Sequence, residues 1–151
     1  MADLLLKSCM YIQPSADGEG LRGCDILVKD TRIAEVGPGL RPASTGGAAG
    51  PRVIDCSRHV VVPGFVNTHH HFYQALTRAL PAVQDAKLFD WLVYLYGVWK
   101  NLDEEAVRAS SLLAMAELLK TGCTCSTDHL YLYPEGVSGD FMALQFEAAT
   151  R

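Results

Sequence analysis

The sequence lacks any cluster of lysine and arginine. Its 151 residues contain 13 Lys and Arg against 17 Asp and Glu, which gives a formal net charge of −4. Because nucleic-acid surfaces need concentrated positive charge, this balance argues against a nucleic-acid partner.

Long apolar runs are also missing. The opening segment, residues 1–7, has no basic region, and its apolar run is too short for a signal peptide. The longest apolar helical stretch, residues 88–99, is interrupted by Asp90 and is too short to cross a bilayer. We therefore expect no membrane partner and a cytoplasmic location.

The cysteines are few and do not form a recognisable framework. There are five, an odd number, and none forms a Cys-x-x-Cys pair. A disulfide scaffold or a zinc ribbon would show a different spacing. Strand alternation suggests that Cys123 and Cys125 are thiols packed in a core. A reducing environment fits this pattern best.

The first part of the chain, residues 1–60, carries strand signals and no helical ones. The strands that we predict are residues 3–13, 24–29, 32–36 and 53–55, with a hairpin turn at Asp30 and Thr31 and a mobile Gly/Ala/Pro-rich loop over residues 38–51. This pattern predicts a small antiparallel β unit.

The second part, residues 61–151, alternates strands with helices. The expected helices are residues 72–80, 88–100, 103–121 and 140–151, with a strand at 123–127. In the helix at 88–100, five apolar residues at helical spacing are expected to pack in the core: Phe89, Trp91, Leu92, Leu95 and Trp99.

The order of strand, helices, strand and helix is typical of parallel βα units, and it predicts an α/β fold. Two such units cannot close a barrel. We therefore expect these residues to be the N-terminal portion of a longer protein.

Three consecutive histidines follow the strand that ends near Thr68. Side chains alternate along an extended chain, so His69 and His71 point to one face and His70 to the other. A His-x-His pair at a strand end can hold one divalent metal ion. The competing interpretation is a polar, histidine-rich loop.

Asp128 and His129 end the next predicted strand, in the equivalent place. In a β/α barrel this edge carries the chemistry. They either contribute to the same site or form a turn with a surface histidine.

Several separate motifs resemble one family. Pro63–His71 after a small β unit resembles the opening of the amidohydrolase superfamily. The segments His71–Gln74, Phe89–Leu92 and Gly122–Tyr131 are most similar to its purine and triazine deaminase branch. The His-x-Glu and Pro-Cys-x-x-Cys signature of the cytidine-deaminase class of zinc enzymes is absent from the sequence.

The resemblance implies a metal-dependent β/α (TIM-like) barrel over residues 61–151 and beyond, preceded by an antiparallel β-sandwich portion over residues 1–60. It implies one divalent metal ion, zinc or else iron, with His69 and His71 as its first two ligands. The other ligands and the catalytic acid–base groups are expected beyond Arg151.

The resemblance also makes Gln74 and Trp91 candidates for contact with substrate. A glutamine can donate and accept hydrogen bonds together, which suits a ring edge with a carbonyl beside an N–H. Otherwise Gln74 is a solvated glutamine and Trp91 a core residue.

The implied activity is hydrolytic deamination of a small amino-substituted heterocycle, with 8-oxoguanine or a related purine as the expected substrate. The sequence leaves open whether the protein forms a homo-oligomer. The alternatives are a triazine aminohydrolase of the hydroxyatrazine type and a non-catalytic scaffold that kept the fold.

Overall fold

The computed structural model describes residues 3–41 and 50–150. The chain divides into two compact units, Met1–Pro63 and Gly64–Arg151. Each unit is described by itself.

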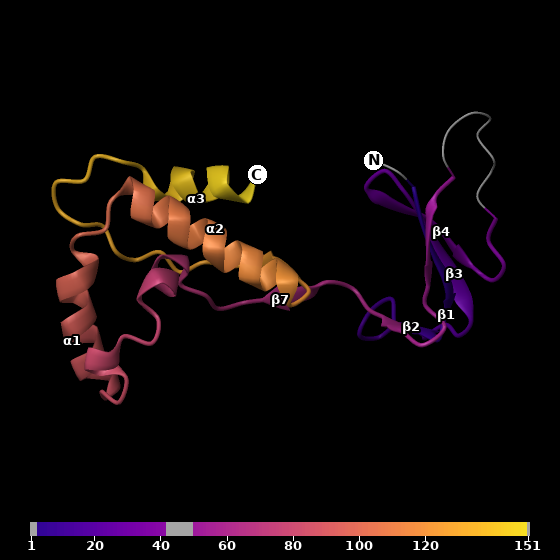
Figure 1. The fold of residues 1–151 in the computed structure, drawn as a ribbon, viewed down its shortest axis with the longest axis horizontal. Helices are drawn as coiled ribbons and strands as arrows, with labels where there is room; N and C mark the ends of the chain where they lie inside the picture. The colour runs from indigo at the N-terminus through magenta and orange to yellow at the C-terminus, as the bar shows by residue number, and fades with distance from the viewer. Residues whose placement is uncertain (1–2, 42–49, 151) are drawn as a thin grey trace. The chain divides into compact units, whose positions relative to one another are not determined.

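The first unit is built from two sheets (Figure 1). A four-stranded sheet has the order β4-β3-β1-β5, and a two-stranded sheet pairs β2 with β6. The strands are β1 (Leu4–Cys9), β2 (Tyr11–Ile12), β3 (Cys24–Lys29), β4 (Arg32–Gly37), β5 (Arg52–Asp55) and β6 (Val60–Val61). The predicted hairpin is confirmed, since β3 and β4 pair antiparallel on either side of Asp30.

The expectation of a purely antiparallel unit is wrong. Strand β5 pairs in parallel with β1, and β6 pairs in parallel with β2. The connection from β4 to β5 is long enough to return the chain to the far side of β1, where it enters in the same direction. Part of the loop predicted for residues 38–51 lies outside the described residues.

The single strand predicted over residues 3–13 is two strands. Ser8 adopts a left-handed backbone conformation (φ 56°), and the register against β3 shifts between Leu6 and Cys9. The chain therefore leaves the first sheet and enters the second one.

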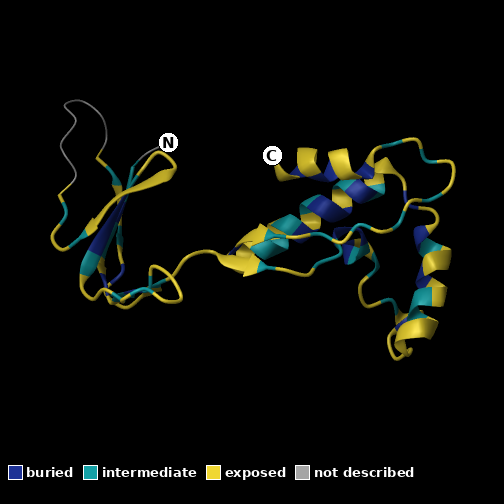
Figure 2. Ribbon diagram, turned by 180° about the vertical axis from the view of Figure 1, so that it is seen from behind, coloured by how far each residue is buried: buried dark blue, intermediate teal, exposed yellow. Residues whose placement is uncertain are grey.

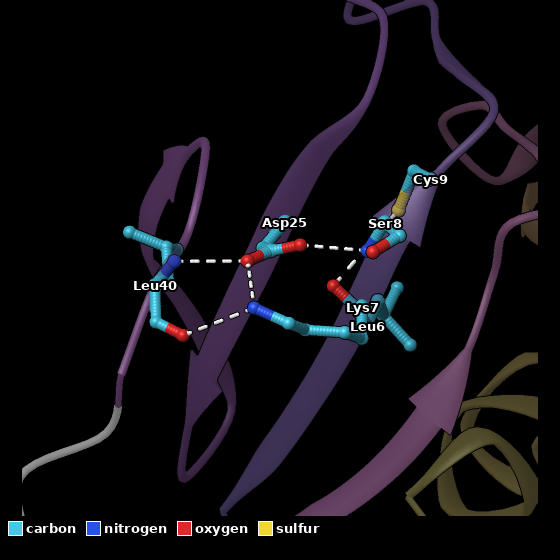
Figure 3. Close-up of polar contacts among 6 residues, drawn as sticks. All are labelled: Leu6, Lys7, Ser8, Cys9, Asp25 and Leu40. Carbon is cyan, nitrogen blue, oxygen red and sulfur yellow. Dashed lines mark hydrogen bonds and ion pairs between the residues drawn. The ribbon is translucent and has the colours of Figure 1, made fainter.

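The buried carboxylate of Asp25 supports this break (Figure 3). It accepts hydrogen bonds from the Ser8 amide (2.6 Å), the Leu40 amide (2.8 Å) and the Lys7 ammonium (2.7 Å). Burial raises the pKa of Asp25, but these hydrogen bonds outweigh it and the pKa lies below the ordinary aspartate value.

The second unit contains the alternating strands and helices. Its elements are β7 (Phe65–Asn67), the 3-10 helices η1 (Phe72–Thr77) and η2 (Pro81–Val83), α1 (Leu88–Trp99), α2 (Glu104–Lys120), β8 (Cys123–Ser126) and α3 (Phe141–Ala149). Strands β7 and β8 pair in parallel, which confirms the predicted βα arrangement. The helix expected at 72–80 is a 3-10 helix that ends at Thr77.

Aspartates cap both helices that follow α1, at the residues where the sequence predicts those helices to start. The Asp103 side chain accepts from the Ala106 amide (2.8 Å) at the start of α2, and Asp140 accepts from the Ala143 amide (3.0 Å) at the start of α3. After α2, Gly122 takes a positive φ of 87°, a conformation that glycine adopts at no steric cost.

Helix α1 buries one face against the core of this unit (Figure 2). Leu95 and Trp99 are fully buried, and Trp91 and Leu92 pack against them. Phe89 was expected in this core but is 79% exposed. It lies beside the buried stripe, on the side of the helix that it shares with Val93, which is 76% exposed.

The two strand thiols differ. Cys123 is buried, as predicted, whereas Cys125 is exposed, so its prediction as a packed thiol is wrong. None of the helices within residues 3–41 and 50–150 is long and apolar enough to cross a membrane.

Candidate metal centre

The ends of β7 and β8 are joined by hydrogen bonds that continue beyond the strands themselves. The Thr127 amide donates to the Asn67 carbonyl (2.9 Å), and the His129 amide donates to the His70 carbonyl (2.8 Å). These bonds hold the segment after β7 beside the segment after β8. Two histidine-containing segments far apart in sequence are thereby placed side by side.

Three imidazoles gather at this edge. One ring nitrogen from each of His69, His71 and His129 lies within 4.8 Å of the others. The ring centroids of His69 and His129 are 4.5 Å apart, and those of His69 and His71 are 4.9 Å apart. His69 and His129 are exposed and His71 is half-buried, so the cluster is open to solvent.

One of these imidazoles has its orientation fixed by the backbone. The Nδ1 atom of His71 lies 2.9 Å from the carbonyl oxygen of His129. A carbonyl can only accept, so Nδ1 carries the proton and the Nε2 lone pair is left for a metal ion. Metal-binding histidines generally have such a partner on the other ring nitrogen. The donor set and this tautomer fit a divalent metal of borderline softness such as Zn²⁺.

Asp128 joins the two segments through its side chain. Its Oδ1 accepts from the Phe72 amide (2.7 Å), the first amide after His71. Its Oδ2 is buried and has no hydrogen-bond partner among the described residues. Asp128 therefore binds the backbone directly next to a candidate ligand.

His70 stands apart from the three clustered imidazoles, as strand alternation predicts. Its ring packs edge-on against Phe72, with 5.0 Å between centroids, and its Nδ1 is buried. Burial lowers the pKa of His70, which favours the neutral ring at neutral pH.

Gln74 lies near the cluster, in η1. Its Nε2 donates to the hydroxyls of Tyr73 and Tyr131, at 3.2 Å in each case. The Tyr131 ring in turn packs edge-on against the His71 ring, with 5.2 Å between centroids. Burial, together with a hydrogen bond that Tyr73 donates to Tyr131, raises the pKa of Tyr73, so this phenol stays protonated at neutral pH.

Trp91 is placed in the core. Its ring contacts Trp99 edge-on at a centroid distance of 5.5 Å. The ring contacts found within the described chain include none between Trp91 and the three clustered histidines. The geometry gives Trp91 a packing role and no contact with the cluster.

A separate apolar cavity of about 440 Å³ lies among α2, β8 and α3. Phe72, Met115 and Phe146 contribute to its lining. It includes Asp128 but none of the three clustered histidines. The cavity is therefore distinct from the candidate metal centre.

His129 is one of the residues whose role the sequence left undecided. The alternative of a turn with a surface histidine stood open because local spacing cannot show which strands pair. The sequence did indicate a shared site, because His129 follows its strand as His69 and His71 follow β7. Since β7 and β8 pair in parallel, their carboxyl ends lie side by side and His129 comes close to the other two histidines.

Fold and site together define an α/β protein with histidines gathered at the carboxyl ends of adjacent parallel strands. Residues 60–150 match the model of the amidohydrolase family. The chain belongs to the amidohydrolase family.

Two relatives indicate the branch. The chain is 49% identical over 113 residues to 8-oxoguanine deaminase from Pseudomonas aeruginosa, covering 74% of this chain and 24% of that protein. It is 38% identical over 138 residues to hydroxydechloroatrazine ethylaminohydrolase from Pseudomonas sp. strain ADP, covering 87% of this chain and 29% of that protein.

Solved structures show the same fold. A triazine hydrolase from Arthrobacter aurescens superposes with a TM-score of 0.81 at 24% identity, over 99% of this chain and 33% of that one. An atrazine chlorohydrolase from Arthrobacter aurescens TC1, in complex with zinc, gives a TM-score of 0.81 over 97% of this chain and 33% of that one. The chain thus spans about a quarter to a third of the length of these proteins.

Proposed function

We propose that these residues form the opening part of a metal-dependent hydrolase that removes an amino group from a small heterocycle, with 8-oxoguanine or a related purine as substrate. The observation that carries the proposal is the convergence of three imidazole nitrogens within 4.8 Å at the ends of two parallel strands. In this proposal residues 64–151 begin a β/α barrel, whose carboxyl-end face is where such enzymes carry their chemistry. The first unit supplies part of a β-sandwich.

His69 and His71 are proposed as the first two ligands of one divalent ion, zinc in preference to iron. When bound, such an ion lowers the pKa of a water molecule and so supplies a nucleophile at neutral pH. The carbonyl of His129 keeps the proton of His71 on Nδ1, so that Nε2 is the ligating atom. The remaining ligands and the acid–base groups are proposed to come from the part of the barrel that the relatives have beyond the matched region.

Gln74 is the residue proposed to orient the heterocycle. Its Nε2 is engaged by two tyrosine hydroxyls, which leaves its Oε1 to accept a hydrogen bond. A ring N–H beside a carbonyl, as in 8-oxoguanine, offers the matching donor. The 49% identity to an 8-oxoguanine deaminase supports this class of substrate.

The test uses the full-length protein with His69→Ala and His71→Ala. Both variants are expected to lose most bound metal and the release of ammonia from 8-oxoguanine. His59→Ala is the matched control, because His59 is exposed and belongs to the first unit. Metal retained at the wild-type ratio in either cluster variant would contradict the proposal.

A triazine aminohydrolase is the second candidate, supported by the 38% identity to hydroxydechloroatrazine ethylaminohydrolase. Assays of product release with 8-oxoguanine, guanine and hydroxylated triazines separate the two candidates. A protein that purifies without stoichiometric metal and turns over none of these substrates is the non-catalytic scaffold.

A further inference from the structure

We propose that Asp128 is a positioning residue for the metal centre: its carboxylate binds the Phe72 amide and thereby holds His71 in ligating position. This inference rests on the proposed function, because it assigns a role toward the proposed metal ion.

The start of η1 is capped by a side chain from the end of β8. The first amides of a helix have no partner within the helix and need an acceptor from elsewhere. The preceding residue, His71, makes no side-chain capping hydrogen bond. Asp128, 56 residues further along the chain, accepts from the Phe72 amide at 2.7 Å instead. Capping by a distant residue ties the start of η1 to the end of β8.

The bond from Phe72 to Asp128 is one of three hydrogen bonds that join the segments after β7 and β8. Two links, Thr127 to Asn67 and His129 to His70, use backbone groups alone. The bond from Phe72 to Asp128 extends the series past His71 and depends on a side chain. Mutation can remove this link without altering the other two.

Both residues that form this bond lie next to a histidine of the cluster. Phe72 follows His71 directly, and Asp128 precedes His129 directly. The His129 carbonyl also contacts Nδ1 of His71. Loss of the carboxylate therefore frees the peptide that follows His71, while the other two links still hold the segment that carries the His129 carbonyl.

The surroundings of the Asp128 carboxylate lower the stability of the fold. Its Oδ2 is buried without a hydrogen-bond partner in the described chain. A buried acceptor without a partner destabilises a fold. An asparagine could cap the same helix without a charge.

Two aspartates elsewhere in this unit provide matched controls. Asp103 and Asp140 each accept from one backbone amide at a helix start, at 2.8 and 3.0 Å. Neither belongs to the histidine cluster. Replacing either one removes a cap of the same kind without touching the segment around His71.

The experiment measures zinc affinity of the full-length protein by competition with a chromophoric chelator. Asp128→Ala is expected to bind zinc about 10–100-fold more weakly than wild type, the range for losing a residue that orients a ligand. Asp128→Asn keeps an oxygen that can accept from Phe72, so it should stay within a few-fold of wild type. Asp103→Ala and Asp140→Ala should lower the melting temperature while leaving zinc affinity unchanged.

Three results would overturn the inference. The first is wild-type affinity in Asp128→Ala, and the second is an equal loss of affinity in Asp140→Ala, which would make the effect one of general stability. The third is an equal loss in Asp128→Asn, because the charge and not the hydrogen bond would then be responsible. If Asp128→Ala does not fold, Asp128→Leu replaces it, because leucine also lacks an acceptor for the Phe72 amide, and wild-type affinity in that variant overturns the inference equally.

The spectrum of the cobalt-substituted protein gives a second readout. A misplaced His71 should change the visible absorption bands in Asp128→Ala and leave them unchanged in Asp140→Ala. Failure of the proposed function is separately visible, because His71→Ala would then retain metal. If His71→Ala loses zinc while Asp128→Ala does not, only the inference about Asp128 fails.

Discussion

Replacing Asp25 by alanine tests how the first unit holds the break between β1 and β2. The side chain is 1% exposed, and its carboxylate accepts hydrogen bonds from two backbone amides and one ammonium group (Figure 3). Alanine leaves the Ser8 and Leu40 amides without an acceptor, in a place where water reaches them poorly. Lys7 is partly exposed, so its ammonium group can bind water in place of the carboxylate, and the loss of this ion pair lowers the unfolding free energy by less.

The magnitude follows from these contacts. Removing one partner from a buried charged group costs about 3–5 kcal/mol. The partial exposure of Lys7 places the expected loss of unfolding free energy at the lower end, about 3 kcal/mol. Asp25→Asn keeps one acceptor oxygen and should cost less, about 2 kcal/mol.

The same carboxylate predicts how stability depends on pH. The pKa of Asp25 is lowered in the folded state, so the folded protein binds fewer protons than the unfolded one near that pKa. Its contribution is complete above the ordinary aspartate pKa of about 3.9 and disappears as the pH falls through the lower, folded-state value. In Asp25→Asn this part of the acid dependence should vanish.

Chemical denaturation followed by far-ultraviolet circular dichroism measures the stability, and hydrogen exchange of the Ser8 and Leu40 amides reports the site itself. Asp55→Ala is the control, because Asp55 is an exposed aspartate in the same unit that accepts from a single amide. A denaturation midpoint in Asp25→Ala equal to that of Asp55→Ala, with unchanged exchange of the two amides, would refute the reasoning.

Three further predictions concern the second unit. Trp99→Ala should lower the unfolding free energy by about 3–5 kcal/mol, since Trp99 is fully buried; urea denaturation measures this, and a loss below that of Trp99→Phe would contradict it. Gly64→Ala should cost about 1–3 kcal/mol because the added Cβ would overlap the Thr124 side chain; Thr124→Ala should restore part of the loss, and the absence of rescue counts against this cause. Tyr131→Phe removes one hydroxyl bound to Gln74. If the proposed function holds, this should raise KM by about 5-fold, an effect near 1 kcal/mol, with a smaller change in kcat. An unchanged KM would exclude a role for Tyr131 in positioning Gln74.

Local patterns predicted much of the second unit. The helices predicted at residues 88–100 and 103–121 are α1 and α2, with each end within one residue of its predicted place. Apolar spacing, the aspartate before α2 and the glycine after it mark these ends. These signals act within a few residues, so one sequence is enough to read them. Phe89 was misplaced because the helical pattern was read without separating the faces of α1.

The first unit was harder because its pairing depends on distant residues. The break at Ser8 depends on a carboxylate from β3, 17 residues away. The parallel place of β5 depends on the path of a long connection. Neither feature can be predicted from the alternation of apolar and polar residues in β1.

The candidate site shows the same division. Alternation separated His70 from His69 and His71 from the sequence alone. The proximity of His129 and the bond from Phe72 to Asp128 required the pairing of β7 with β8, which is a long-range contact.

Because the His71 ring binds the His129 carbonyl 58 positions away, an ion on Nε2 of His71 would help to hold the two ends of a large loop of the polypeptide together. Closing such a loop is costly in entropy, and a bound ion offsets part of that cost. Chelation should then loosen the junction of the two strands before it melts either helix. The rate at which amides near Asn67 and Thr127 exchange with deuterium would record that loosening directly.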